Sequence, residues 1–123
     1  MKRNPEARPE DLLLAKYTQL KEFYHDPALE AGYYRYTHAE YPSKEYFHTA
    51  REAAEAGFRA AYPNLNLEGT RFFTTFVYVI YPCGNKYEWC MTRSGYIYFA
   101  QKRLYRWHVR EQAKYAAELE AKS

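Results

Sequence analysis

The sequence predicts a single α+β domain with two N-terminal helices, a three-stranded antiparallel meander and a long amphipathic C-terminal helix. Apolar residues recur at helical spacing near both ends of the chain, whereas Phe, Tyr, Val and Ile concentrate between residues 71 and 100 in strand-like runs. At 123 residues, 47% hydrophobic and 20% aromatic, the chain has the size of one domain and too much aromatic surface for a disordered protein. We therefore expect one domain spanning residues 1–123.

The first helix is predicted to begin at Pro9, because proline suits the first helical position and acidic residues follow it. Its apolar face comprises Leu13, Tyr17, Leu20 and Tyr24. Residues 1–8 are polar and are expected to fray. Asp26 and Pro27 predict a short helical turn ending at Gly32.

The stretch Tyr33–Tyr41 shows neither helical nor strand period and is expected to be a loop or a short extended piece. Ser43 is the expected N-cap of the second main helix, which ends at Pro63. The apolar face of this helix comprises Phe47, Ala50, Ala54, Phe58 and Ala61, and its opposite face comprises Glu45, His48, Glu52, Glu55 and Arg59.

Three strands are predicted at Arg71–Tyr81, Lys86–Thr92 and Tyr96–Ala100, separated by turn residues. The first is apolar on both alternating sides, which is typical of a central strand. The residues expected in the core are Phe76, Val77, Val79 and Trp89.

The positive charge is concentrated in the last helix. Residues 101–123 hold 6 of the 18 Lys and Arg residues but only 3 of the 15 Asp and Glu residues, which accounts for the whole net charge of +3. A localised surplus acts on partners through its electrostatic field.

Around this helix, the predicted partner-binding residues form one stripe: Arg103, Arg106, Trp107, Arg110 and Lys114. The face expected to bury against the sheet comprises Leu104, Tyr105, His108, Val109, Tyr115, Ala116 and Leu119. The stripe can meet nucleic-acid phosphates or an acidic protein surface, with Trp107 as an anchor. Alternatively, it pairs internally with Glu45, Glu52 and Glu55.

Two further surfaces are candidates. Tyr33, Tyr34, Tyr36 and Tyr41 form a possible secondary interface, because tyrosine buries a large area at low entropic cost. Arg93, in a glycine-containing turn, is a possible anion contact. The strand aromatics Phe72, Phe76, Tyr78, Tyr87, Trp89, Tyr96 and Tyr98 can stack bases, but core or subunit-interface roles are favoured.

No catalytic motif, phosphate-binding glycine pattern or metal-ligand spacing is recognisable, so we expect no enzyme activity, no metal and no cofactor. Cys83 and Cys90 have the wrong spacing for a zinc or redox pair and are expected to be free thiols, with Cys90 buried. No membrane association is expected, and a reducing, cytoplasmic setting is the default.

The function predicted from these features is that of a small non-catalytic binding protein. Its basic C-terminal helix engages nucleic acid or a nucleic-acid-handling protein, as an inhibitor or accessory factor. The first alternative is a small-ligand binding or sequestering protein with a Tyr-rich, anion-selective pocket. The second is a structural homo-oligomer.

Overall fold

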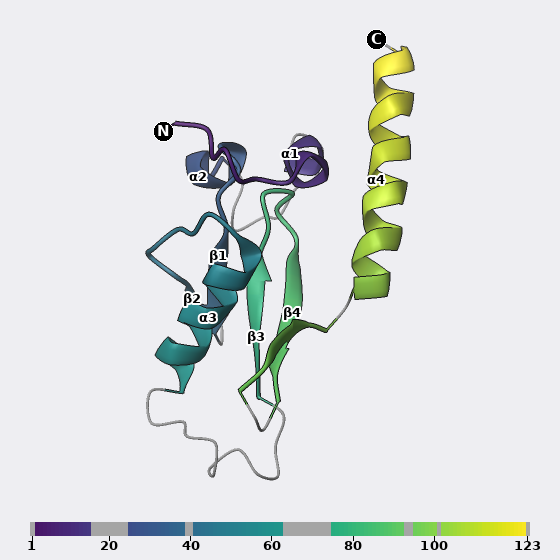
Figure 1. Cartoon of the computed structure of the whole chain (residues 1–123). Coiled ribbons are helices and arrows are strands. Elements are labelled where there is room, and N and C mark those ends of the chain that lie inside the picture. The colour runs from purple at the N-terminus through teal and green to yellow at the C-terminus, as the bar shows by residue number, and fades with distance from the viewer. Residues whose placement is uncertain are drawn as a thin grey trace.

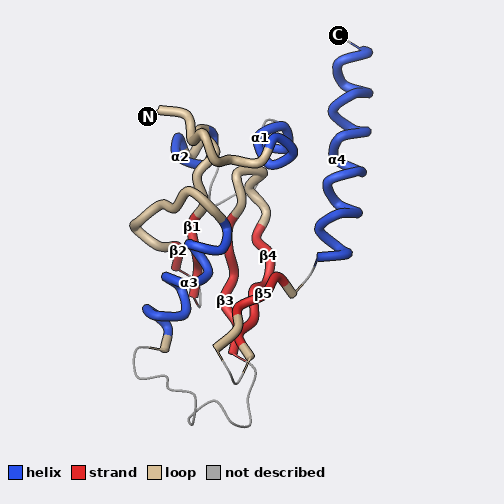
Figure 2. Tube along the Cα trace, viewed as in Figure 1, coloured by secondary structure: helices blue, strands red, loops and turns tan. Residues whose placement is uncertain are grey.

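The computed structural model describes residues 2–15, 25–38, 41–62, 75–92, 95–100 and 102–122. Helices and strands are mixed in this part of the chain, which confirms the α+β class (Figures 1 and 2). The elements in order are α1 (Pro9–Ala15), α2 (Pro27–Glu30), β1 (Arg35–His38), β2 (Tyr41–Pro42), α3 (Ala50–Ala61), β3 (Thr75–Ile80), β4 (Lys86–Met91), β5 (Ile97–Phe99) and α4 (Lys102–Lys122).

The sheet has five strands in the order β2-β1-β3-β4-β5, with every neighbouring pair antiparallel. The predicted meander is present as β3, β4 and β5, but the prediction of only three strands is wrong. The segment expected as a loop contributes β1 and the two-residue β2. β1 joins the sheet by pairing with β3, with Tyr36 opposite Val79, and no local pattern in four residues reveals such a pairing.

One side of the sheet forms the core beneath α3. Val77, Trp89 and Phe99 are neighbours across three strands on this side, and Val77 and Trp89 are buried as predicted. α3 packs here through Ala53, Ala54 and Phe58. It approaches closely because Gly57 has no Cβ: a Cβ there would lie 3.1 Å from Cβ of Tyr36.

The other side of the sheet carries Phe76, Cys90 and Tyr98 in one row. The expectation that Phe76 belongs to the core is wrong, because its side chain is 44% exposed. Phe76 alternates with the buried Val77, so it points away from α3.

The start of α3 differs from the prediction. Its N-cap is Thr49, whose hydroxyl accepts a hydrogen bond from the Glu52 amide at 3.1 Å. Ser43 is instead buried, and its hydroxyl accepts from the Tyr36 amide at 3.2 Å and donates to the Glu45 carbonyl at 2.7 Å. It therefore braces the connection between β2 and α3 and does not cap the helix.

The N-terminal segment is better anchored than its polar composition suggests. The Asn4 side chain is buried and donates to the carbonyls of Gly32 and His48 at 2.8 and 2.9 Å. A frayed start is therefore wrong for Asn4. The short helix α2 is confirmed, since Asp26 caps it and Gly32 follows it with φ of 95°.

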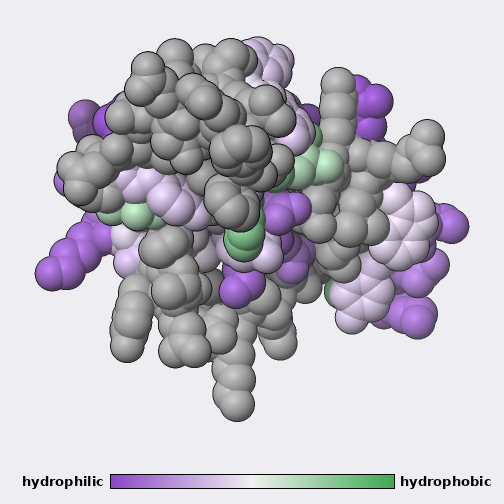
Figure 3. Space-filling model, turned by 90° about the horizontal axis from the view of Figure 1, so that it is seen from below, coloured by the Kyte–Doolittle hydropathy of each residue, from purple (hydrophilic) through white to green (hydrophobic). Residues whose placement is uncertain are grey.

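α4 stands at one side of the molecule, and its C-terminal end extends beyond the other elements in Figures 1 and 2. Its principal contact is with α1. Seen from below, the described surface is mostly hydrophilic, with only small apolar areas (Figure 3).

Candidate functional site: the basic side of the C-terminal helix

Arg106, Arg110 and Lys114 form a row of exposed cations on α4. A spacing of four residues places successive side chains about 40° apart around the helix and about 6 Å apart along it. Among the described residues, the two ion pairs are Arg8–Glu10 and Arg35–Asp26, and neither involves this row. We call Arg106, Arg110 and Lys114 the basic row; the side chain of Arg103, predicted to join it, lies outside the described residues.

Trp107 lies at the edge of the basic row and is 52% exposed. Such exposure of a tryptophan side chain is unusual, since tryptophan is largely buried in most folded proteins. An aromatic ring beside arginines suits both base stacking and anchoring at a protein interface.

A different side of α4 faces the protein. Ala116 is buried, Val109 and Ala113 are half-buried, and Val109 packs against the core cluster. The predicted buried face was too broad, because Tyr115 is 49% exposed and Leu119 is 38% exposed. Among the described side chains of α4, those that face the protein are therefore small.

The described residues give no support to internal neutralisation of the basic row. The acidic side chains proposed for that pairing belong to α3 or the segment before it, and α3 lies on the opposite side of the sheet region from α4 in Figure 1. The row thus faces solvent.

The tyrosines predicted as a secondary interface do not form an exposed surface among the described residues. Tyr34 is 1% exposed, and its ring packs edge-on against Tyr81 with centroids 5.3 Å apart. Tyr33 and Tyr36 are half-buried, and Tyr36 packs against Phe47. The predicted interface is wrong for Tyr34, and the side chain of Tyr41 lies outside the described residues.

The predicted anion contact Arg93 also lies outside the described residues. Of the residues on either side of it, the Gly95 amide donates to the Thr92 carbonyl at 3.0 Å, and Gly95 has φ of 87°.

The strand aromatics divide into two groups. Tyr87 and Trp89 are buried, and the Trp89 indole N–H donates to the Tyr81 hydroxyl at 3.1 Å. Phe76 and Tyr96 are exposed on the side of the sheet away from α3, where Tyr96 stacks on Tyr98 with an interplanar angle of 15°. Phe72 lies outside the described residues.

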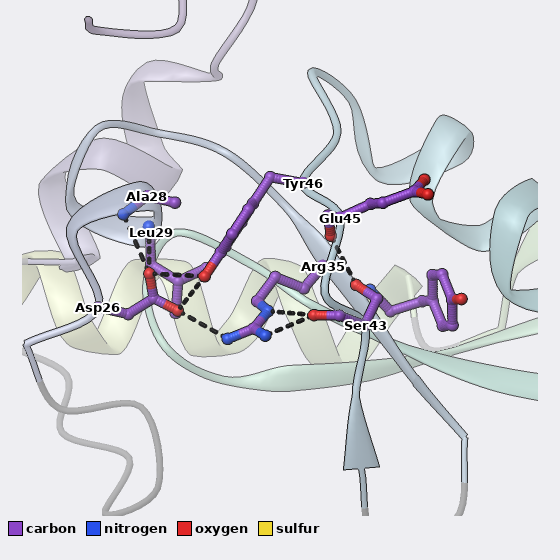
Figure 4. A network of polar contacts seen from close by, with 8 residues as sticks. Asp26, Ala28, Leu29, Arg35, Ser43, Glu45 and Tyr46 are labelled. Atoms are coloured by element: carbon purple, nitrogen blue, oxygen red, sulfur yellow. Dashed lines mark hydrogen bonds and ion pairs between the residues drawn. The ribbon is translucent and has the colours of Figure 1, made fainter. Parts of the chain in front are cut away.

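The Arg35 guanidinium takes part in contacts within the fold. It bonds the Asp26 carboxylate at 2.9 Å and the Ser43 carbonyl, while the Tyr46 hydroxyl also donates to Asp26 (Figure 4). This network ties the cap of α2 to β1 and to the turn before α3. Arg35 therefore differs from the basic row, which holds no such partner among the described residues.

Sequence reasoning missed a buried carboxylate, Asp11. The Tyr34 hydroxyl donates to its Oδ2 at 2.7 Å, and Oδ1 has no hydrogen-bond partner among the described residues. Burial raises the pKa of Asp11 to about 6, although the Tyr34 hydrogen bond and the charge of Arg8 act in the opposite direction. An acidic residue in the first turn of a helix is common, so the sequence does not show that this one is buried. Its burial becomes visible only in the tertiary structure.

Other chemistry finds little support in the described part of the chain. It contains no cluster of three or more potential metal ligands, and both cysteines are free and buried. Nor does any described helix combine the length and apolar character needed to span a membrane. Comparison with protein-family models, curated proteins and solved structures gives no match to this chain.

Proposed function

We propose that this protein is a non-catalytic binding protein whose α4 engages an anionic partner, either nucleic acid or a protein that handles nucleic acid. The observation that carries the proposal is the exposed basic row of Arg106, Arg110 and Lys114. Like charges four residues apart cost an isolated helix about 0.2–0.5 kcal/mol per pair, so the row opposes helix stability and a bound anion would relieve it.

The linear form of the row favours a linear partner. Cations repeating at about 6 Å along one helix side can follow a phosphate backbone or an acidic helix. Trp107 at the edge adds a flat apolar surface for a base or for an interface pocket. An inhibitor or accessory factor would need no more than this surface.

The test is titration of the full chain with single- and double-stranded oligonucleotides at several salt concentrations. Arg106→Glu with Arg110→Glu should abolish binding, and neutralising one cation at a time should reduce the magnitude of the salt slope by about 1 each. The matched control is Lys44→Glu with Arg59→Glu, which makes the same change in net charge at exposed positions away from α4.

Salt dependence separates the two partner classes. Oligonucleotide binding by the wild type that weakens steeply as salt rises supports nucleic acid. If oligonucleotides do not bind, affinity capture from nuclease-treated lysate should recover a single acidic protein, and the charge-reversed variant should not. Equal capture of partners by the charge-reversed variant would refute the proposal.

A further inference from the structure

Trp107 lies between cations and acids on the exposed surface of α4. At about 100° per residue, its side chain leaves the helix about 60° from that of Arg110 on one side and about 40° from that of Glu111 on the other. Glu118 falls on the same side of Trp107 as Glu111, about 20° from Trp107 around the helix. All four side chains are exposed. The surface of α4 therefore changes from positive to negative across a flat, uncharged indole ring.

This distribution of charge restricts the form of an anionic partner. A partner with negative charge across its whole contact surface would bring part of that charge against Glu111 and Glu118. A partner with one narrow line of anions beside an uncharged flat group would meet the basic row and Trp107 alone. A nucleic-acid single strand has this form, because its phosphates follow the backbone and its bases project away from them.

The indole of Trp107 favours a single strand over a duplex. Base pairs in a duplex stack on one another, so the grooves expose the edges of the bases and not their faces. An indole offers a broad ring face and a single N–H donor, so stacking on a base face is the contact that uses most of it. Base faces become accessible where the strand is single.

The spacing along α4 lets neighbouring nucleotides reach both kinds of group. Arg106 and Arg110 lie about 1.5 and 4.5 Å from Trp107 along the helix axis, on either side of it. A phosphate held between these two guanidinium groups is therefore nearly level with the indole. Lys114 continues the basic row about 6 Å beyond Arg110, where it can meet a following phosphate.

We propose that the partner of α4 is single-stranded nucleic acid, with its phosphates along the basic row and a base stacked on Trp107. The inference rests on the proposed function, because it specifies which anionic partner the basic row binds. Every base has an aromatic face, so this contact does not select a particular sequence. A duplex or an acidic protein is the competing outcome of the test.

The first experiment measures the affinity of the full chain for three probes: a short oligothymidylate, a duplex of the same length, and an abasic strand with the same phosphates but no bases. The oligothymidylate should bind most tightly. Trp107→Ala should lower its affinity by about fivefold or more and leave the affinity for the abasic strand unchanged. The control is Tyr115→Ala, which removes another exposed ring of α4 and should change none of the three affinities.

The second experiment locates the base by fluorescence. Stacking should quench the emission of Trp107, so the oligothymidylate should quench the wild type and the abasic strand should not. Trp107→Phe leaves the buried Trp89 as the one tryptophan, so quenching should disappear. Binding should persist in this variant, because phenylalanine retains a ring on which a base can stack.

Four results would overturn the inference: no binding of the oligothymidylate, equal affinity for the abasic strand, tighter binding of the duplex, or an unchanged affinity after Trp107→Ala. The charge-reversed variant distinguishes this failure from that of the proposed function. If Arg106→Glu with Arg110→Glu still abolishes binding of a duplex, an abasic strand or a captured acidic protein, the basic row remains the binding site. Binding that the charge reversal does not weaken would refute the proposed function as well.

Discussion

At the scale of single residues, Asp11 shows how burial gives an ordinary side chain an unusual property. It stands in the first turn of α1, where acids normally favour a helix through its dipole. Here the carboxylate is fully buried against Tyr34, which lies 23 residues further along the chain. The folded protein therefore holds a proton that the unfolded chain releases more easily.

The first prediction concerns the pH dependence that follows from Asp11. Its pKa is about 6 in the folded protein against 3.8 in the unfolded reference, so the folded state binds more protons between these values and stability falls as pH rises through this window. At about 1.4 kcal/mol per pKa unit, the loss is roughly 3 kcal/mol. Asp11→Asn should remove this part of the dependence in denaturant titrations at pH 4 and pH 7.

The control for this measurement is Glu10→Gln, the same chemical change at the neighbouring half-buried position. It should preserve the fall in stability. A wild-type protein equally stable at both pH values, or an Asp11→Asn variant with the full dependence, would contradict the assignment to Asp11.

The second prediction concerns the two thiols. Burial raises the pKa of Cys83 to about 12 and also raises that of Cys90, so neither supplies appreciable thiolate near neutral pH. Iodoacetamide at pH 8 should modify neither residue in the folded protein and both in denaturant, as measured by mass spectrometry. Rapid labelling of folded Cys83 would show that its site opens.

At the scale of elements, α2 is only four residues long and depends on its attachments. Asp26 caps it by accepting from the amides of Ala28 and Leu29, and the same carboxylate binds Arg35 at the start of β1. The Asp26 side chain thus joins the N-terminus of α2 to β1, a strand that the sequence did not predict.

The third prediction separates these two roles of Asp26. Asp26→Asn keeps a capping oxygen but removes the charge, whereas Asp26→Ala removes both. A cap contributes about 1 kcal/mol, and breaking a mostly buried ion pair costs about 3–5 kcal/mol. Denaturant unfolding should therefore show Asp26→Ala less stable than Asp26→Asn by about 1 kcal/mol, with both clearly below the wild type. Equal stability of all three would mean that the network in Figure 4 contributes nothing.

At the scale of the whole molecule, the described side chains of α4 divide into a covered group around Ala116 and an exposed group that includes the basic row. The core cluster consists of apolar side chains of α3 and the sheet, and the member that α4 adds at its edge is the uncharged Val109. Binding surfaces on α4 can therefore be altered without disturbing the fold.

The fourth prediction follows from this separation. Arg106→Glu with Arg110→Glu should change the free energy of unfolding by no more than about 0.5 kcal/mol, as surface substitutions do. Ala116→Arg is the contrasting variant, because it forces a long charged side chain into the buried contact side of α4 and should destabilise the protein by more than 1 kcal/mol. A large loss of stability in the charge-reversed variant would indicate internal pairing of the basic row.

The sequence by itself determined the features that depend on neighbouring residues. The α+β class, the meander of β3, β4 and β5, the capped turn at Asp26 and the long basic helix all follow from local periodicity, caps and composition. The basic row also follows, because four-residue spacing alone places its members on one side of a helix.

Only the tertiary structure decided the features that depend on distant residues. β1 exists as a strand because it pairs with β3, and Asp11 of α1 is buried together with Tyr34, which lies just before β1. Likewise, apolar residues occupy much of the α4 circumference, so periodicity did not distinguish the covered Ala116 from the exposed Leu119. The difference comes from how α4 packs on the rest of the protein, where it contacts α1, and no pattern local to α4 contains that packing.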